Sequence, residues 1–398
     1  MALSLASAAV VATVALLAPL TVRWLRLPVP EIVVQIVAGA VIGPQVLGLA
    51  TADAPVAVLA TVGLGFLLLL AGLEVDLRRL RGRVLRLTLA AFALSFALAC
   101  GVGAGLAATG LVRSPLLIAV ILSATGLGIV LPVLEDTGVL ATSFGQVLVA
   151  GASIAEVVPI VLLSLLFTRD GGALGSRLVL LGVFLGLVLA VVVLLLGVER
   201  SRRLSRVLVS LQDTTAEIRV RGAVCLLLLL AAAAAAFGLE GILGAFLAGV
   251  ALSLLDRDET ATHSLFRTKL QAVGFGAFVP FFFVSTGMGI DVRGLVGDPA
   301  TLAKVPIFVV ALLVVRALPA GLYASLARGG RQVVAAGLVQ ATSLSIPVVA
   351  GAIGVDLGVI LPGTYAALVA AGLVSVIVFP PVAASLLGGR RDRAPSVS

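Results

Sequence analysis

The chain has 398 residues, of which 61% are hydrophobic and 12% charged, and its formal net charge at pH 7 is +8. This composition excludes an ordinary soluble domain, and the continuous apolar runs do not alternate as the strands of a membrane β-barrel do. The sequence therefore predicts an all-α polytopic membrane protein.

About thirteen apolar runs follow one another along the chain, separated by short polar or glycine and proline clusters. Most are near the roughly 20 helical residues that cross a hydrocarbon core, whereas the ninth is short enough to be a tilted or partial crossing. We expect membrane helices at residues 3–22, 30–47, 55–73, 85–108, 114–134, 143–167, 178–198, 218–237, 241–254, 270–288, 302–326, 333–353 and 357–387.

The basic residues gather in alternate loops between these runs. With the amino terminus outside, 21 of the 27 basic residues lie on the cytoplasmic side, five lie outside, and Arg316 lies within a run. Cytoplasmic loops of membrane proteins carry this excess. We therefore expect a multi-pass protein of the plasma membrane with a cytoplasmic tail at residues 388–398, whose positive charge contacts anionic lipid and not nucleic acid.

The polar motifs of enzymes and cofactor proteins are absent from the sequence. It offers no catalytic triad, no cluster of metal ligands and no phosphate-binding loop. We therefore expect no catalytic residues, no structural metal and no cofactor, so the chain is not expected to be an enzyme. No fused regulatory domain is expected, because only a short tail follows the last run.

Two charged residues lie near the middle of apolar runs, Glu156 in the sixth and Arg316 in the eleventh. Glu156 is thirteen residues beyond Ser143, which places it about 20 Å along its helix. Each charge costs several kcal/mol in lipid unless it is partnered, hydrated or used. A buried salt bridge that fixes helix packing is one interpretation. We favour an ion pathway, in which Glu156 exchanges a proton for a cation and Arg316 is a counter-charge, a gate or a structural tie.

Two helix ends share the pattern G-x-x-[VI]-D-x-R-x-L, at residues 72–80 and 287–295. They end the third and tenth runs, seven crossings apart, so they lie on opposite sides of the membrane. An inverted repeat requires this relation, although chance similarity between helix ends also produces such a match. In an inverted repeat, runs four to six correspond to runs eleven to thirteen.

The fifth and twelfth runs carry the densest polar interruptions, and they are equivalent in the expected repeat. Hydroxyl residues, glycine and a nearby proline weaken a helix, and unwound backbone at membrane depth lines protein or a wet cavity. Small residues that merely allow close helix packing are the alternative. We predict two crossed discontinuous helices, interrupted around Ser123, Thr125, Gly126 and Gly128 and around Gln340, Thr342, Ser343 and Ser345.

Together these segments resemble the monovalent cation:proton antiporter superfamily, that is, Kef-type antiporters and the membrane domain of sodium/proton exchangers. The resemblance covers most of the chain and includes SATGLG at residues 123–128 and the basic residue Arg316. It is clearest in VAGAVIGPQVLGL (37–49), GLGFLLLLAGLEVDLRRL (63–80), GILGAFLAGV (241–250) and PFFFVSTGMGID (280–291).

The resemblance implies a homodimeric transporter whose transmembrane domain spans residues 1–387. Helices at about 85–167 and 302–387 would form a core that moves like an elevator against the remaining dimerisation and linker helices. Relatives usually carry two adjacent acids, or Asn-Asp, on the sixth helix, where this chain has Ala155 and Glu156. The common Gly-Glu of the twelfth helix is replaced by Thr342 and Ser343.

One carboxylate per protomer implies electroneutral exchange of one proton for one monovalent cation, sodium or potassium. Hydroxyl groups of Ser153, Thr125 and Ser343 would then replace the missing carboxylate oxygens as ligands. Two alternatives remain open. One is a Kef-like potassium efflux channel, against which the missing nucleotide-binding tail argues, and the other is a divergent relative that carries another solute.

Overall fold

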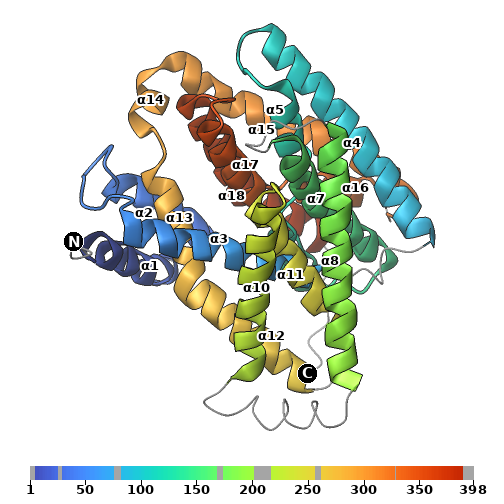
Figure 1. Cartoon of the computed structure of the whole chain (residues 1–398). Helices are drawn as coiled ribbons and strands as arrows, with labels where there is room; N and C mark the ends of the chain where they lie inside the picture. The colour runs from blue at the N-terminus through green and yellow to red at the C-terminus, as the bar shows by residue number, and fades with distance from the viewer. Residues whose placement is uncertain are drawn as a thin grey trace, which may run out of the picture. The chain divides into compact units, whose positions relative to one another are not determined.

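The computed structural model describes residues 5–25, 29–75, 82–167, 174–200, 217–255, 261–327 and 329–388, and these contain helices and no strand. Eleven helices among the described residues are long and apolar enough to cross a membrane (Figure 1). Two apolar helices, Glu31–Ile42 and Gly241–Leu254, are shorter. The all-α membrane fold is thus confirmed, and the predicted number of about thirteen crossings is approximate.

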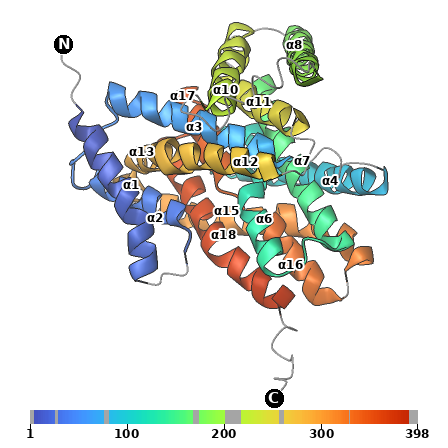
Figure 2. The same ribbon diagram turned by 90° about the horizontal axis from the view of Figure 1, so that it is seen from below.

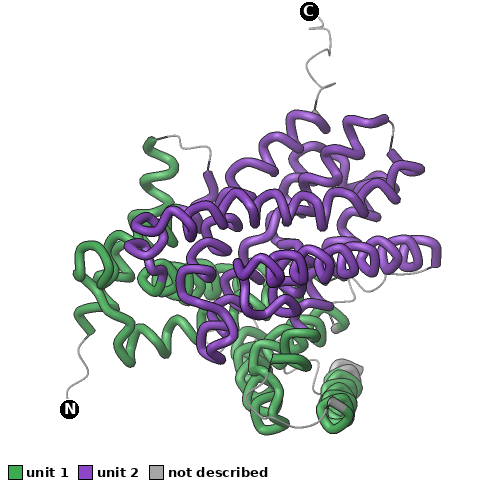
Figure 3. The backbone as a smooth tube through the Cα atoms, turned by 90° about the horizontal axis from the view of Figure 1, so that it is seen from above, with its two compact units in different colours: residues 1–25, 34–75, 161–289 green, residues 26–33, 76–160, 290–398 purple. Residues whose placement is uncertain are grey.

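The chain divides into two compact units (Figure 3). Unit 1 comprises residues 1–25, 34–75 and 161–289, and unit 2 comprises residues 26–33, 76–160 and 290–398. The predicted roles of a dimerisation panel and a moving core are a separate matter and stay a prediction.

Unit 1 is built mainly from α1 (Ala6–Trp24), α2 (Glu31–Ile42), α3 (Ala54–Glu74), α8 (Leu174–Arg200), α10 (Ile218–Ala236), α11 (Gly241–Leu255), α12 (Ala261–Val273), the π-helix η1 (Gly274–Phe278) and α13 (Val279–Met288). Glycines let these helices approach at backbone distance. A methyl group added at Gly72 of α3 would meet the Phe246 carbonyl of α11, and one at Gly249 of α11 would meet the Leu69 carbonyl of α3. Small residues at such contacts favour helix association in lipid.

The two largest boundary differences from the sequence prediction in unit 1 are at α2 and α12. Helix α2 has only 12 residues and ends at Ile42 instead of residue 47, because Pro44 disfavours helical backbone at the residue before it. The tenth run was predicted to begin at residue 270, but α12 begins at Ala261 and continues through η1 into α13. The apolar pattern missed the polar first turns of this helix.

Unit 2 contains α4 (Gly82–Ala108), α5 (Pro115–Leu122), α6 (Leu127–Asp136), most of α7 (Ser143–Leu166), α14 (Val292–Gly297), α15 (Pro299–Ala320), the 3₁₀ helix η2 (Gly321–Leu326), α16 (Gly330–Gln340), α17 (Ser345–Asp356) and α18 (Pro362–Gly388). The order of a continuous, a broken and a continuous helix occurs twice, in α4 to α7 and again in α15 to α18. Within the second set α15 packs against both α16 and α18 (Figure 2).

Both predicted discontinuous helices are present in unit 2. The first is interrupted between Leu122 and Leu127, and the second between Gln340 and Ser345. The inverted relation between the two sets stays a prediction, because residues 76–80 of the first shared motif lie outside the described residues. In the second motif, Asp291 caps α14 by accepting a hydrogen bond from the Gly294 amide at 2.8 Å.

The glycine contacts of unit 1 yield a stability prediction. Gly249→Ala places a methyl group against the Leu69 carbonyl, and overpacking of this kind costs about 1–3 kcal/mol, so we expect a lower Tm of the purified protein in detergent. Gly222→Ala in α10 is the matched control, since no described residue has an atom within 4 Å of its added methyl group. Equal Tm values for the two variants would show that the α3 and α11 backbones are not in close contact.

Candidate functional site

Helix α7 places Glu156 in the interior of unit 2, where only 4% of the residue is exposed. Its Oε2 atom accepts a hydrogen bond from the Leu127 amide at 3.1 Å. Leu127 is the first residue of α6, the second half of the first broken helix. A helix N-terminus carries partial positive charge and unpaired amides, so this position stabilises an ionised carboxylate or another negative group.

The first break, residues 123–126, is held by backbone hydrogen bonds on two sides. The Thr125 amide donates to the Ala155 carbonyl of α7 at 3.2 Å. The Gly126 amide donates to the Thr342 carbonyl in the second break at 2.9 Å. The two unwound segments therefore meet directly, one residue away from the amide that holds Glu156.

The second break, residues 341–344, is held from α18 by Ser375. The Ser343 amide donates to Ser375 Oγ at 3.2 Å, and the same hydroxyl lies within hydrogen-bonding distance of the Ser343 carbonyl, at 3.1 Å, and the Gly372 carbonyl, at 2.7 Å. Ser343 is fully buried, yet its own Oγ has no hydrogen-bond partner among the described residues. This hydroxyl is therefore available as a ligand.

Arg316 of α15 is 4% exposed and donates to oxygens on three other elements. Nε bonds Thr125 Oγ1 at 2.9 Å and the Gln340 carbonyl at 3.3 Å, and Nη2 bonds Gln340 Oε1 at 2.7 Å. Nη1 bonds Ser95 Oγ of α4 at 3.1 Å. All these acceptors are neutral, so Arg316 ties α4 and both broken helices together.

Gln340, the last residue of α16, extends this network to α7. Its Nε2 atom donates to the Leu148 carbonyl at 2.8 Å, while Oε1 accepts from Arg316. Gly151 leaves room for the contact, because an added methyl group there would lie 3.2 Å from Gln340 Nε2 and would overlap the Tyr323 hydroxyl. The side chain of Gln340 thus links Arg316 to the helix that carries Glu156.

Capping fixes the start of α15. Asp298 accepts hydrogen bonds from the Ala300 amide at 3.0 Å and from the Thr301 hydroxyl at 2.6 Å. The bond from the Thr301 hydroxyl and those from the backbone lower the pKa of the Asp298 carboxyl. An ionised carboxylate at this N-cap stabilises the first turn of α15, the helix that also carries Arg316.

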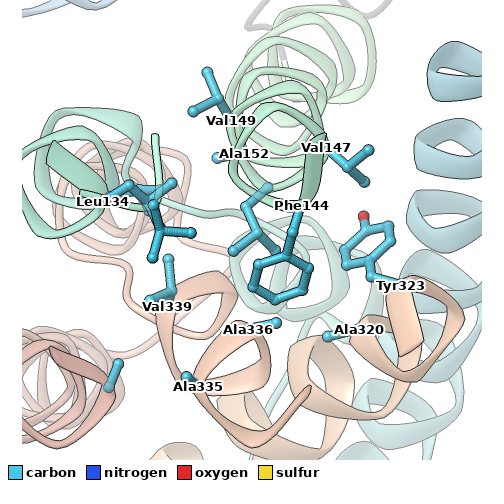
Figure 4. Packing of buried hydrophobic residues seen from close by; sticks show 14 of the residues in the cluster. Leu134, Phe144, Val147, Val149, Ala152, Ala320, Tyr323, Ala335, Ala336 and Val339 are labelled. Carbon is cyan, nitrogen blue, oxygen red and sulfur yellow. The ribbon is translucent and has the colours of Figure 1, made fainter. Parts of the chain in front are cut away.

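An apolar cluster lies within unit 2 (Figure 4). Its side chains converge from α6, α7, α15, η2 and α16, and include Leu134, Phe144, Val147, Tyr323 and Val339. The packing keeps these helices together beside the unwound segments, where helical hydrogen bonds are missing.

The structure brings together most of the residues that the sequence singled out. Glu156, Arg316, Thr125, Gly126, Gln340, Thr342 and Ser343 are joined by the contacts above. Ser123 and Ser153 instead bond carbonyls of their own helices, Val120 at 2.9 Å and Val149 at 2.9 Å. Gly128 is exposed on α6, and Ser345 is half-buried at the start of α17.

Two residues of the network, Ser95 and Ser375, were missed by the sequence analysis. Each is a serine in a long apolar run and is fully buried. Serines in such runs usually bond their own helix, so the sequence held no signal for contacts with other elements. Among the described residues, no group of three or more His, Cys, Asp and Glu side chains could hold a metal ion.

A family model described as "Sodium/hydrogen exchanger, transmembrane" matches residues 11–387. The chain belongs to this family. The resemblance drawn from the sequence is thereby confirmed, and the family is one of membrane transporters for cations and protons.

Curated relatives extend the sodium/hydrogen exchanger assignment. The relative YjbQ of Bacillus subtilis (strain 168) is 29% identical to this chain over an alignment of 405 positions. The alignment covers 98% of this chain and 64% of YjbQ. The chain therefore spans less than two thirds of that relative's length. The Na(+)/H(+)-K(+) antiporter GerN of Bacillus cereus is 27% identical over 382 residues, with 94% of both chains covered.

A solved structure of the sodium proton antiporter MjNhaP1 from Methanocaldococcus jannaschii at pH 8 has the same fold as this exchanger-family chain. The TM-score is 0.69, with 96% of this chain and 99% of that chain covered, at 17% sequence identity. This likeness shows the shared fold alone.

The hydrogen bonds of Arg316 predict that the stability of the fold depends on the shape of its guanidinium group as well as on its charge. Arg316→Lys keeps the charge but offers donors from a single nitrogen, so some of Ser95, Thr125 and Gln340 lose their partner. Unsatisfied buried groups cost about 1–3 kcal/mol each, and we expect a clearly lower Tm.

The matched control is Arg113→Lys, which changes an exposed arginine of the same unit and should leave Tm unchanged. If Arg316→Lys unfolds at the temperature of the control variant, the tie between α4 and the broken helices is not the stabilising contact described above.

Proposed function

We propose that this chain is a secondary antiporter that exchanges sodium or potassium for protons through Glu156. The observation that carries the proposal is the position of this buried carboxylate, which meets the first amide of α6 beside two unwound segments that contact each other. Unwound backbone in the membrane supplies carbonyl oxygens and amides where a helix would hide them. A dehydrated cation needs such oxygens.

The chemistry follows from competition for one carboxylate. Ionised Glu156 binds a monovalent cation, and a proton that binds the same group expels the cation. Because each ligand brings one positive charge to one site, the exchange is electroneutral. Each unit of pH difference then supplies about 1.4 kcal/mol per proton for moving the cation uphill.

Neutral oxygens complete the proposed site. The buried Ser343 hydroxyl and the carbonyls of the two breaks are the candidates, together with the hydroxyls of Thr125 and Ser153. Hydroxyl and carbonyl oxygens are ligands that alkali cations accept in proteins. The name of the relative GerN includes both sodium and potassium, which supports testing both cations here.

The remaining parts of the proposal rest on the family and the sequence. The protein works as a homodimer in the plasma membrane, with its amino terminus outside and its carboxyl terminus in the cytoplasm. The helices at about 85–167 and 302–387 move as an elevator that carries the ion. No cofactor takes part, and the chain is not an enzyme.

Liposomes that contain the purified protein test the exchange. With a preset pH gradient, addition of sodium or potassium chloride should collapse the gradient, whereas choline chloride should not. Glu156→Gln should reduce the rate to that of empty liposomes, because an amide cannot exchange a proton. The rate should be the same whether the membrane potential is clamped at zero or made negative inside.

Glu135→Gln is the matched control, since Glu135 is an exposed carboxylate in the last turn of α6. It should exchange like the unmodified protein. Full exchange by Glu156→Gln would exclude Glu156 as the carrier, and a flux independent of the pH gradient would favour the efflux-channel alternative.

Ser343→Ala tests the neutral ligand. Removing a buried hydroxyl that lacks a hydrogen-bond partner leaves no other group unsatisfied, so Tm should not fall. If Ser343 Oγ binds the cation, the KM for the cation should rise about tenfold, the value expected for one lost polar contact.

Ser385→Ala in α18 is the control for the serine substitution. Among the described residues, the Ser385 hydroxyl bonds only the Val382 carbonyl of its own helix, at 2.7 Å. The KM of this variant should match that of the unmodified protein. An unchanged KM in Ser343→Ala would remove Ser343 from the set of ligands.

A further inference from the structure

Pro159 lies inside α7, three residues after Glu156. In an α-helix the amide of each residue donates to the carbonyl four residues earlier, and proline has no amide hydrogen. Pro159 therefore leaves the Ala155 carbonyl without its usual helical donor. The proline ring also pushes that carbonyl away from the helix axis.

The freed carbonyl has a specific partner in the structure. Ala155 is fully buried, and its carbonyl accepts the hydrogen bond from the Thr125 amide at 3.2 Å. Thr125 belongs to the first break, where it has no helical acceptor of its own. The free acceptor of α7, the Ala155 carbonyl, and the unpaired donor of the break, the Thr125 amide, thus satisfy each other immediately before Glu156 in the chain.

The same arrangement occurs around the other buried charge. Pro319 lies three residues after Arg316 in α15 and leaves the Val315 carbonyl without its helical donor. Ser95 Oγ donates to this carbonyl at 2.9 Å, and Ser95 Oγ in turn accepts a hydrogen bond from Arg316 Nη1. In both helices a proline thus frees the carbonyl that precedes a buried charge, and a neighbouring element binds it.

We propose that Pro159 is a positioning residue for ion exchange, acting through the Ala155 carbonyl to hold the first break against Glu156. The proposal rests on the proposed function for its transport consequence. Its structural part, the dependence of the Thr125 contact on the proline, stands independently of transport.

Pro159→Ala is the decisive variant, because it restores an amide that can donate to Ala155. The helical bond turns the carbonyl back towards the axis and competes with the Thr125 amide. Since proline is unfavourable inside a helix, Tm should be equal to or higher than that of the unmodified protein. The KM for sodium in liposome exchange should nevertheless rise about tenfold, with kcat changed less than about twofold.

Pro306→Ala is the matched control in α15. The carbonyl that Pro306 frees belongs to Leu302, which is 48% exposed, so no contact with a break depends on it. This variant should gain stability in the same way and keep its KM. A gain in stability together with a loss of apparent affinity, confined to Pro159→Ala, would support positioning, because a merely structural proline would not separate the two.

Hydrogen exchange provides a second readout that does not require transport. In Pro159→Ala, the amides of residues 123–126 should exchange faster than in the unmodified protein, while Pro306→Ala should leave them unchanged. An unchanged exchange rate of this segment in Pro159→Ala would overturn the proposal, and so would an unchanged KM. If the unmodified protein exchanges no cation at all, the proposed function fails, and the hydrogen-exchange comparison still decides the positioning role.

Discussion

The structure depends on one constraint, the need to satisfy backbone polar groups where no water is at hand. Two helices of unit 2 are unwound in the middle of apolar runs, which exposes amides and carbonyls that a helix would pair internally. The breaks solve this by pairing with each other, between the Gly126 amide and the Thr342 carbonyl. Other amides of the breaks pair with continuous helices, the Thr125 amide with the Ala155 carbonyl of α7 and the Ser343 amide with the Ser375 hydroxyl of α18. The position of Glu156 is a consequence of this pairing.

The two buried charges are accommodated in different ways. Glu156 meets an amide at the start of α6, where the helix dipole favours negative charge. Arg316 is surrounded by hydroxyl and carbonyl oxygens from α4 and both broken helices. The sequence left open whether Arg316 is a counter-charge, a gate or a tie. Its hydrogen bonds connect α4 with both broken helices, which is the arrangement expected of a structural tie, and its role in transport stays a prediction.

The sequence predicted what depends on composition and on rare residues in apolar surroundings. Glu156 and Arg316 stood out because charges at membrane depth are expensive, and the breaks stood out because hydroxyl residues and glycine cluster there. The partners of these residues were not predictable, because Ser95 and Ser375 look like ordinary serines of apolar helices. Pro44 is a sequence signal for the early end of α2, but the apolar residues around it favoured a longer helix in the prediction.

The neutrality of the acceptors around Arg316 has a consequence for a carrier with two alternative cargoes. Ser95, Thr125 and the Gln340 side chain keep the same charge across the ordinary pH range, so none of the hydrogen bonds to Arg316 depends on whether Glu156 is protonated. Under the proposed exchange, the frame that Arg316 holds around the broken helices would therefore be the same with a proton or with a cation on Glu156. No free energy of exchange would then go into rebuilding these contacts.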